Sequence, residues 1–508
     1  MKKYILLSLV ALGFTSSCSI DDNIDPNNPS IATGTAEIRM VAAQVNAYRA
    51  QGQYMNELGN IFTSAWGGNN YFFGNPMVEA NTLNVSNGFY QRIFSYTYGG
   101  AFNLNQVIKG PDAASKPNYV AMAKIQKAHQ MQYLVDLYND IPYTEAFDQT
   151  ILSPKFDSGF SVYQGLMGEL NEAIALIRNS NYTAANKQYD VIMGGDMRKW
   201  EKFANTVKLR FLVRMSKSPK AEVKTFVQTE LAKLAGAQFV DFDVTINPGF
   251  NSASFVTQNP SYATNGRQLF NGADNTNGYT IFRATKYAGD LLNGAAGTKT
   301  EGVPDPRASK IFVPVGGKIA GLVSGAPKID GLESDDFSAL GGNLAADRGV
   351  GSVTNGYLMT KAESELLQAE AAVEFPSGGF GDAKTHWQNA ITASFVFNGL
   401  TAASATSYMS SISSKPNVGW DATGDKLAAI QYQRFIANMN INAMETYIDY
   451  LRTGYPNDIP LAGNAAQPRR PYRLLYPAGE LGSNSNTPNV TLEDIFVKNQ
   501  FTPFWNQN

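Results

Sequence analysis

The chain has 508 residues and a formal net charge of −2 at pH 7, and 44% of its residues are hydrophobic. This length and hydrophobic content allow a large buried core, so the composition indicates a globular protein and excludes a disordered chain. The near-neutral charge, with no long basic run, excludes the electrostatic footprint of a nucleic-acid-binding protein.

The N-terminus has the pattern of a secretory signal. Met1-Lys2-Lys3 is followed by an apolar run over residues 5–14 and then by small residues up to Cys18. The run is too short to cross a bilayer, so residues 1–17 are predicted to be a signal peptide. Cys18 is the only cysteine and lies where bacterial lipoproteins carry their lipid, which predicts its lipidation. The alternatives are a buried or free thiol that carries no lipid, and a plain signal peptide cut a few residues away.

Residues 18–30 are predicted to form a lipidated tether. The sequence DPNNPS at residues 25–30 contains two prolines and several turn formers and cannot hold a helix. The acidic stretch after Cys18 is similar to the surface-export signal of Bacteroidetes, and this resemblance implies a chain that faces the cell exterior. No later apolar stretch is long enough to span a membrane, so attachment by lipid is expected.

The first part of the body is predicted to be helical, with helices over residues 36–51, 119–138, 161–178 and 197–215. The helix over residues 119–138 has apolar residues at helical spacing and is predicted to be amphipathic, ending before Pro142. Residues 64–75, SAWGGNNYFFGN, are predicted to form a loop rich in glycine, asparagine and aromatic residues.

The character changes over residues 219–356, where Gly, Asn, Thr and Ser dominate and only short strand-like pieces such as 311–315 occur. Helical periodicity returns over residues 357–375 and 383–395, and these two helices resemble a tetratricopeptide-like pair. A last long helix is predicted over residues 427–451, closed by Gly454 as a left-handed cap and by Pro456. The chain after residue 460 is predicted to wrap the surface as an extended tail.

Four sequence motifs carry a resemblance to a known family. The first is AKIQKAHQMQYLVDLYNDIPYTEAF, with its exit residues Asp140, Pro142, Tyr143, Glu145 and Ala146. The second is the short motif Asp305-Pro306-Arg307, and the third is the acidic, alanine-rich helix LMTKAESELLQAEAA. The fourth is the most specific and joins QYQRFIANMNINAMETYIDYLRTGYP to PRRPYRLLYPAGELGSN.

These motifs resemble those of the SusD/RagB-like nutrient-binding outer-membrane lipoproteins, in the SusD-like branch. The fourth motif matches at Glu445, Tyr447, Asp449, Tyr450, Arg452, Thr453, Gly454 and Pro456, and in the tail at Arg473, Tyr476, Pro477, Glu480 and Asn484. It departs from the family pattern where tyrosines replace common tryptophans and Leu451 replaces a frequent arginine.

The resemblance implies a mostly α-helical SusD-like scaffold with tetratricopeptide-like helix pairs and a large loop-rich insertion with few short strands. We expect one nutrient-binding domain over residues 31–508. Its helical scaffold covers residues 31–217 and 357–460, its loop-rich region 218–356 and its wrapping tail 461–508.

The resemblance also implies a function. Such a lipoprotein binds a glycan, or a peptide in RagB-like members, and delivers it to a partner SusC-like TonB-dependent transporter of the outer membrane. No catalysis and no cofactor are expected. The chain has only two histidines, so a histidine-based zinc site is not expected, and Asp241 and Asp243 match no calcium loop.

The family's most recognisable residues are predicted to build the fold. Arg452 and Asp449 at one helix end, with Arg473 and Glu480 in the tail, would form ion pairs that hold the tail to the helix. Ligand contacts are expected in the variable loops instead.

Two loops are candidates for these contacts, because sugars need exposed rings for stacking and short amides for hydrogen bonds. The first candidate loop contains Trp66, Asn69, Asn70, Tyr71, Phe72 and Phe73. Its alternative role is to fill the core beneath a loop. The second candidate covers residues 258–282 and contains Tyr262, Asn265, Arg267 and Tyr279. Its alternative role is that of a solvated loop.

Two other functions compete with nutrient binding. An exported glycoside hydrolase would need two placed carboxylates, but the helical series opposes the barrel folds typical of such enzymes, and no G-x-S-x-G motif occurs. A purely structural surface lipoprotein is the second alternative, and replacement of Trp66 and Tyr71 by alanine would distinguish it, because only a ligand-binding loop would lose affinity without unfolding.

Overall fold

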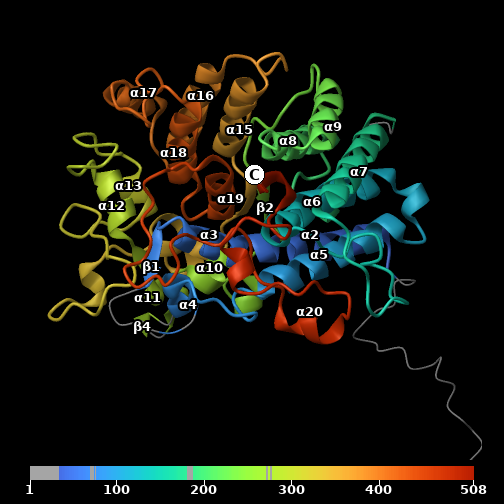
Figure 1. Cartoon of the computed structure of the whole chain (residues 1–508), viewed down its shortest axis with the longest axis horizontal. Coiled ribbons are helices and arrows are strands. Elements are labelled where there is room, and N and C mark those ends of the chain that lie inside the picture. Colours follow the sequence, from blue (N-terminus) through green and yellow to red (C-terminus); the bar gives the residue numbers. More distant parts are fainter. Residues whose placement is uncertain are drawn as a thin grey trace, which may run out of the picture.

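Helices form most of the structure and the strands are short, which confirms the predicted mostly α-helical fold (Figure 1). The computed structural model describes residues 34–68, 74, 76–179, 187–270, 273–274 and 277–507. Cys18 and the predicted tether lie outside the described residues. The helices are α2 Ala36–Arg49, α3 Asn56–Phe62, α4 Met77–Thr82, α5 Arg92–Lys109, α6 Pro117–Tyr138, α7 Gly159–Asn179, α8 Met197–Met215, α9 Ala221–Ala232, α10 Pro260–Asn265, α11 Asn277–Ile281, α12 Lys286–Asn293, α13 Ala308–Ile311, α14 Arg348–Gly351, α15 Lys361–Glu374, α16 Ala383–Phe397, α17 Ala402–Ile412, α18 Lys426–Asn438, α19 Ala443–Thr453 and α20 Ala478–Ser483.

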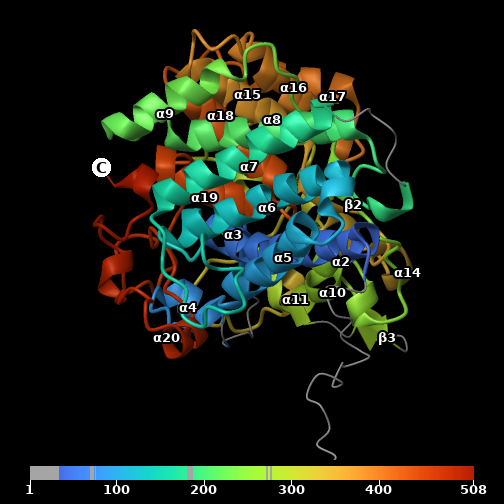
Figure 2. The same cartoon turned by 90° about the vertical axis from the view of Figure 1, so that its right-hand side faces the viewer.

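The long helices form a series in which each packs on the next. α2 packs on α5, α5 on α6, α6 on α7, α7 on α8, and α8 in turn contacts α15. α15 packs on α16 and on α18. Figures 1 and 2 show this series running from α2 and α5 in the lower half to α15 and α16 at the top. The pairs α6–α7 and α15–α16 are neighbours in sequence and in space, as the tetratricopeptide-like pattern predicts.

α6 lies in the middle of the series and is buried on all sides. Its residues from Tyr119 to Tyr138 are buried almost without exception, so the predicted amphipathic helix with a solvent face is wrong here. The reason is that α2, α5, α7 and α8 all pack around it. Some of its polar groups find partners inside the core: Gln126 donates to the Gln44 carbonyl at 2.9 Å, and Asp136 accepts from the Tyr163 hydroxyl at 2.6 Å.

The described strands form three antiparallel pairs. These are β1 (Trp66–Gly68) with β5 (Phe282–Ala284), β2 (Val244–Ile246) with β6 (Gly356–Met359), and β3 (Leu269–Phe270) with β4 (Ala273–Asp274). The region between residues 219 and 356 is therefore loop-rich with short strands, as predicted, but it also contains the helices α9 to α14, of which α9 is the longest. This helix was missed because it buries only Val223, Val227 and Glu230, and its otherwise polar composition looks like that of a loop.

Two predicted helices have different bounds in the structure. The helix predicted over residues 357–375 begins only at Lys361, because the residues before it form β6. The Thr360 hydroxyl accepts the backbone N–H of Glu363 at 3.1 Å and caps α15.

The helix predicted over residues 427–451 is two helices, α18 and α19. Asn440, with a φ of 66°, turns the chain between them. Asparagine adopts this left-handed conformation more readily than most residues. The helix therefore breaks at Asn440, although the apolar pattern of the sequence continues through this position. The predicted cap is confirmed at Gly454, which ends α19 with a φ of 76°.

Buried ion pairs connect α8 and α15 with α18 and α19. Arg214 donates to Glu445 and to Asp449, each at 2.6 Å, and Arg452 contacts Asp449 at 3.1 Å. Arg452 and Asp449 therefore pair with each other within α19, and the prediction that they hold the tail by ion pairs is wrong. Because these charges are deeply buried, their mutual pairing is what makes their burial tolerable.

The prediction that Arg473 and Glu480 form ion pairs with the end of α19 is wrong. The Nε of Arg473 donates to the Leu474 carbonyl at 3.0 Å, and its Nη1 donates to the Phe501 carbonyl at 3.1 Å. Glu480 accepts from the Asn484 amide at 3.0 Å. Arg473 therefore connects two parts of the tail through hydrogen bonds to backbone carbonyls. The charge pattern of the sequence cannot predict such bonds, because every residue carries a carbonyl.

Candidate ligand-binding site

The two segments predicted to contact a ligand are joined by the β1–β5 pair. Trp66 lies opposite Ala284, and Gly68 lies opposite Phe282. α3 leads into β1 and packs so tightly on α19 that a methyl group at Gly59 would lie 2.2 Å from the backbone nitrogen of Met444. Segments more than 200 residues apart in sequence therefore meet at one place.

Trp66 is a core residue in this structure, which corrects its prediction as an exposed stacking ring. Its side chain is fully buried, and its indole ring packs on Phe282 with the ring centroids 5.2 Å apart. The indole N–H donates to the Oδ1 of Asn440 at 2.7 Å. The other predicted residues of this loop, Asn69, Asn70, Tyr71, Phe72 and Phe73, lie outside the described residues and follow directly after Gly68.

The second candidate segment is also more buried than a solvated loop. Tyr262 and Asn265 on α10 are buried, and the Tyr262 hydroxyl donates to the carbonyls of Arg267 and Ala346. Arg267 is half-buried and lies 3.6 Å from the carboxylate of Asp347. Tyr279 is partly buried, and its carbonyl accepts from Arg283. Tyr262 therefore holds the segment in place.

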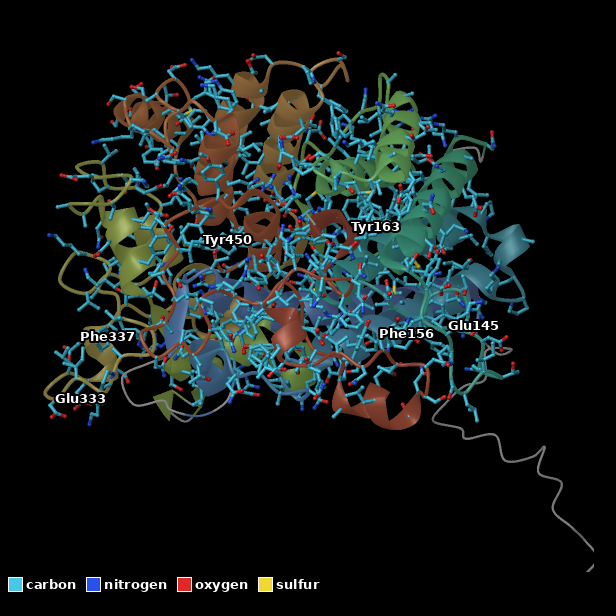
Figure 3. The ribbon with its side chains drawn as sticks, viewed as in Figure 1. Glu145, Phe156, Tyr163, Glu333, Phe337 and Tyr450 are labelled. Carbon is cyan, nitrogen blue, oxygen red and sulfur yellow. The ribbon has the colours of Figure 1, made fainter. Side chains whose placement is uncertain are left out.

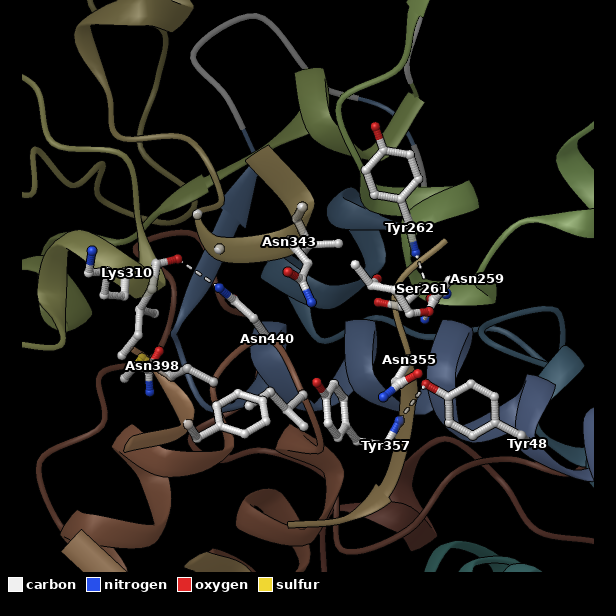
Figure 4. A pocket seen from close by; sticks show the side chains of 18 residues that line it. Tyr48, Asn259, Ser261, Tyr262, Lys310, Asn343, Asn355, Tyr357, Asn398 and Asn440 are labelled. Carbon is white, nitrogen blue, oxygen red and sulfur yellow. Dashed lines mark hydrogen bonds between the residues drawn. The ribbon is translucent and has the colours of Figure 1, made fainter. Parts of the chain in front are cut away.

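A hollow lies beside Asn440, where several distant segments converge (Figure 4). It encloses about 610 Å³, open solvent at its mouth included. We call it the amide hollow, because the described residues that line it include Asn259, Asn343, Asn355, Asn398 and Asn440. The amides of Asn259 and Asn440 are already hydrogen-bonded at both ends. Among the described residues, the amide of Asn343, the Oδ1 of Asn398 and the Nδ2 of Asn355 remain for a ligand with hydroxyl or amide groups.

Two aromatic rings form one wall of the amide hollow. Tyr357 and Phe397 are half-buried and meet edge to face, with their centroids 5.0 Å apart. Figure 4 shows the Tyr357 hydroxyl facing the same space as the Asn343 amide. Burial raises the pKa of Tyr357, so the hydroxyl is neutral and can both donate and accept at physiological pH.

Asn440 connects the hollow to the core. Its Nδ2 donates to the Ile311 carbonyl at 2.7 Å, while its Oδ1 accepts from the Trp66 indole. The amide is therefore fixed in orientation, and β1, the break between α18 and α19, and the end of α13 are tied together. Asn343, by contrast, is exposed, and its side chain has no hydrogen-bond partner among the described residues. Its amide is free for a ligand.

The charges around the hollow are few. Among the described lining residues Lys310 is the only charged side chain, and none is acidic. The lining therefore offers hydrogen bonds and ring surface rather than an acid–base pair. In the described part of the chain no three acidic, histidine or cysteine side chains gather in a way that could hold a metal ion.

The amide hollow was not predicted from the sequence, apart from Tyr262. Its lining comes from Tyr48 and from segments near residues 260, 311, 343, 356, 398 and 440. The one local signal was the asparagine-rich stretch ANMNIN before α19, which was interpreted as helix interior. Asparagine there favours a break, and breaks often line binding sites.

The fold and the hollow define a helical binding-protein scaffold with a polar ligand site. The sequence matches the SusD-like family described as "starch-binding associating with outer membrane" over residues 65–477. The match covers most of the chain, so the chain belongs to this family, as its motifs indicated. A search of curated proteins found no match.

Solved structures share the fold. A chitin-binding SusD homologue from Flavobacterium johnsoniae is 23% identical, with a TM-score of 0.68 over 89% of this chain and 93% of that chain. A SusD homologue from Bacteroides uniformis is 20% identical, with a TM-score of 0.69 over 92% of this chain and 99% of that chain. In the described part of this chain no helix is long and apolar enough to span a bilayer.

Proposed function

We propose that the protein is a lipid-anchored outer-membrane protein, facing the cell exterior, that binds an oligosaccharide in the amide hollow and delivers it to a SusC-like TonB-dependent transporter. The amide hollow is the observation that carries the proposal. It combines asparagine side chains with a half-buried aromatic wall in a space open to solvent. Family membership supports the outer-membrane location, and the chitin-binding relative supports a glycan ligand.

An oligosaccharide suits this lining better than a charged ligand. A sugar ring presents C–H groups to an aromatic wall and hydroxyl groups to amides. A peptide would present an alternating pattern of backbone donors and acceptors, which asparagine side chains can also satisfy. The peptide alternative is therefore decided by the binding experiment below.

The aromatic loop after Gly68 is a second contact in this proposal. Asn69, Asn70, Tyr71, Phe72 and Phe73 leave β1, whose Trp66 is bonded to Asn440 at the hollow. This connection supports a loop that starts near the ligand. Lipidation at Cys18 supplies the attachment, and the protein is proposed to act by binding alone, without a cofactor or metal.

A glycan and peptide binding screen with matched variants tests the proposal. We expect the full-length chain to bind neutral oligosaccharides, and replacement of both Tyr357 and Phe397 by alanine to reduce that affinity at least tenfold. Tyr71→Ala should reduce it as well. The control replaces Tyr54 and Tyr96, another edge-to-face pair at 5.4 Å outside the hollow, and should leave the affinity unchanged.

Each outcome of the screen has a definite meaning. Selective binding of peptides, reduced by the Tyr357 and Phe397 variant, would replace the glycan with a peptide ligand. An unchanged oligosaccharide affinity in that variant would remove the amide hollow from the function. Binding of neither class would contradict nutrient binding itself.

A further inference from the structure

A second hollow lies among α5, α6 and α7, and its lining shares no residue with the amide hollow. It spans about 1200 Å³, open solvent at its wide mouth included. We call it the α5–α7 hollow; its described lining is Asn105, Gln106, Lys109, Lys127, Tyr143, Thr144, Phe147, Asp148, Gln149, Thr150 and Glu169. Figure 3 labels Glu145, which follows Thr144 of this hollow in the chain, on the right of the molecule.

The floor of the α5–α7 hollow is built around a buried lysine. Lys127 is 4% exposed, and its ammonium donates to Glu169 at 2.8 Å. The same ammonium lies 4.9 Å from the ring centroid of Phe147 and 5.4 Å from that of Tyr143. The Tyr143 hydroxyl also donates to Glu169 at 2.8 Å. Cation–π attraction and these hydrogen bonds fix both rings before any ligand arrives.

The loop that carries the rings is held at both of its ends. The carboxylate of Asp157 accepts the backbone N–H groups of Tyr143 and Thr144 at 3.0 and 2.8 Å. Asp148 accepts the backbone N–H and the hydroxyl of Thr150 at 2.9 and 2.6 Å. The wall of the hollow is therefore a preformed surface rather than an adaptable loop.

Three amide side chains around the hollow are uncommitted. Asn105, Gln106 and Gln149 make no side-chain hydrogen bond to any residue that the structure describes. This differs from the amide hollow, where Asn259, Asn398 and Asn440 already bind backbone carbonyls. Free amides beside fixed rings are the groups that hydrogen-bond and stack on a sugar.

The charges of the hollow favour a neutral ligand. Glu169 neutralises Lys127, and Asp148 lies on the same surface as the exposed Lys109. Neither an anion nor a cation would therefore find an excess of opposite charge there.

We propose that the α5–α7 hollow is a second carbohydrate-binding site, which takes a neutral segment of a glycan chain. This inference goes beyond the single ligand site of the proposed function. Two sites on one chain that bind the same polymer would raise the overall avidity for long chains above that for short ones.

A binding experiment with site-specific variants tests the inference. The probes are maltoheptaose, chitohexaose and mannohexaose, together with the corresponding polymers, and the protein is the full-length chain. We expect Phe147→Ala and Gln149→Ala together to lower the affinity for a polymer about tenfold. In the background of Tyr357→Ala and Phe397→Ala, the same two changes should abolish the remaining binding.

A second variant and a control show whether a loss of affinity could be caused by unfolding. Asn105→Ala with Gln149→Ala changes only side chains at the hollow surface and should give a smaller loss in the same direction. Gln388→Ala, an exposed glutamine on α16, should have no effect. A cooperative thermal transition equal to that of the wild type checks the fold of each variant.

The outcomes separate this inference from the proposed function. Polymer binding unchanged by the α5–α7 variants would overturn the second site and leave the amide hollow intact. Loss of all binding in the Tyr357 and Phe397 variant alone would overturn it too. Binding that depends only on the α5–α7 residues would retain the second site and contradict the amide hollow. Absence of binding by the wild type to every probe would overturn both.

Discussion

Glu57 is a carboxyl group buried in α3, close to the chain that leads into β1. Its pKa is raised by burial to about 7, and the hydrogen bond that it accepts from Tyr90 at 2.6 Å acts in the opposite direction. A raised carboxyl pKa means that the folded state binds its proton more tightly than the unfolded state. The contribution of Glu57 to stability is therefore complete below pH 4.5 and is lost as the pH rises through 7.

Glu57→Gln should remove this dependence on pH. The amide oxygen still accepts from Tyr90, and no charge has to be buried above pH 7. We expect the variant to be more stable than the wild type at pH 8, by on the order of 3 kcal/mol at most, and about as stable at pH 4.5. Chemical denaturation at both pH values measures the difference.

The matched control is Glu493→Gln, because Glu493 is an exposed glutamate near the C-terminus. It should change stability little at either pH. If the difference in the free energy of unfolding between Glu57→Gln and the wild type were the same at pH 4.5 and at pH 8, Glu57 would not be a buried titrating group.

At the level of elements, the break between α18 and α19 shapes the amide hollow. The left-handed Asn440 brings its amide to the Trp66 indole and to the Ile311 carbonyl. Asn440→Ala would leave the buried indole N–H without a partner and would also strain the backbone. We expect the free energy of unfolding to fall by about 1–3 kcal/mol or more, measured by denaturant titration, and the ligand affinity to fall with it.

Two variants separate the cost of the unpaired indole N–H from the cost of the strained backbone. Asn440→Gly relieves the backbone strain but still leaves the indole unpaired, so it should retain most of the loss. Asn417→Ala changes an asparagine with a similar φ of 69° that makes no side-chain hydrogen bond to the described residues, so it reports the backbone cost alone. Equal losses for Asn440→Ala and Asn417→Ala would show that the Asn440 amide contributes nothing.

Helices were predictable where one apolar face persists over several turns. The predicted bounds of residues 197–215 coincide with α8, because its Asp196 cap and its apolar spacing agree. The break at Asn440 and the strand β6 were missed because apolar residues continue through both at a spacing that also fits a helix. Tertiary contacts favour a turn at Asn440 and a strand at β6, and a local pattern of apolar residues gives no information about such contacts.

The candidate site was predictable only in part. Sequence composition pointed to the segments around Trp66 and Tyr262, and the structure places both beside the amide hollow. It did not reveal that the rings of Trp66 and Tyr262 are buried, since an aromatic residue in a loop has the same local signal whether it faces solvent or core. Tyr357 was taken for a helix residue and Phe397 lay just past a predicted helix, and neither gave a signal of a site.

For the whole molecule, the mode of attachment follows from Cys18 in our proposal. Cys18→Ala should yield a folded, ligand-binding protein that is released from the membrane fraction, because a lipid chain is the proposed anchor. Cell fractionation and incorporation of a labelled fatty acid measure this. Ser19→Ala is the control and should leave the protein in the membrane.

A Cys18→Ala protein that stays in the outer membrane and still incorporates fatty acid would contradict Cys18 as the site of the lipid anchor. A variant that is released but no longer binds oligosaccharide would contradict the separation of attachment and ligand binding.

The amide hollow as a ligand site is tested most directly by a crystal structure of the protein with the oligosaccharide that binds it best. We expect a sugar ring against the wall formed by Tyr357 and Phe397, with hydroxyl groups bonded to the Asn343 amide. An oligosaccharide bound elsewhere, with the amide hollow empty at saturating ligand, would contradict this assignment.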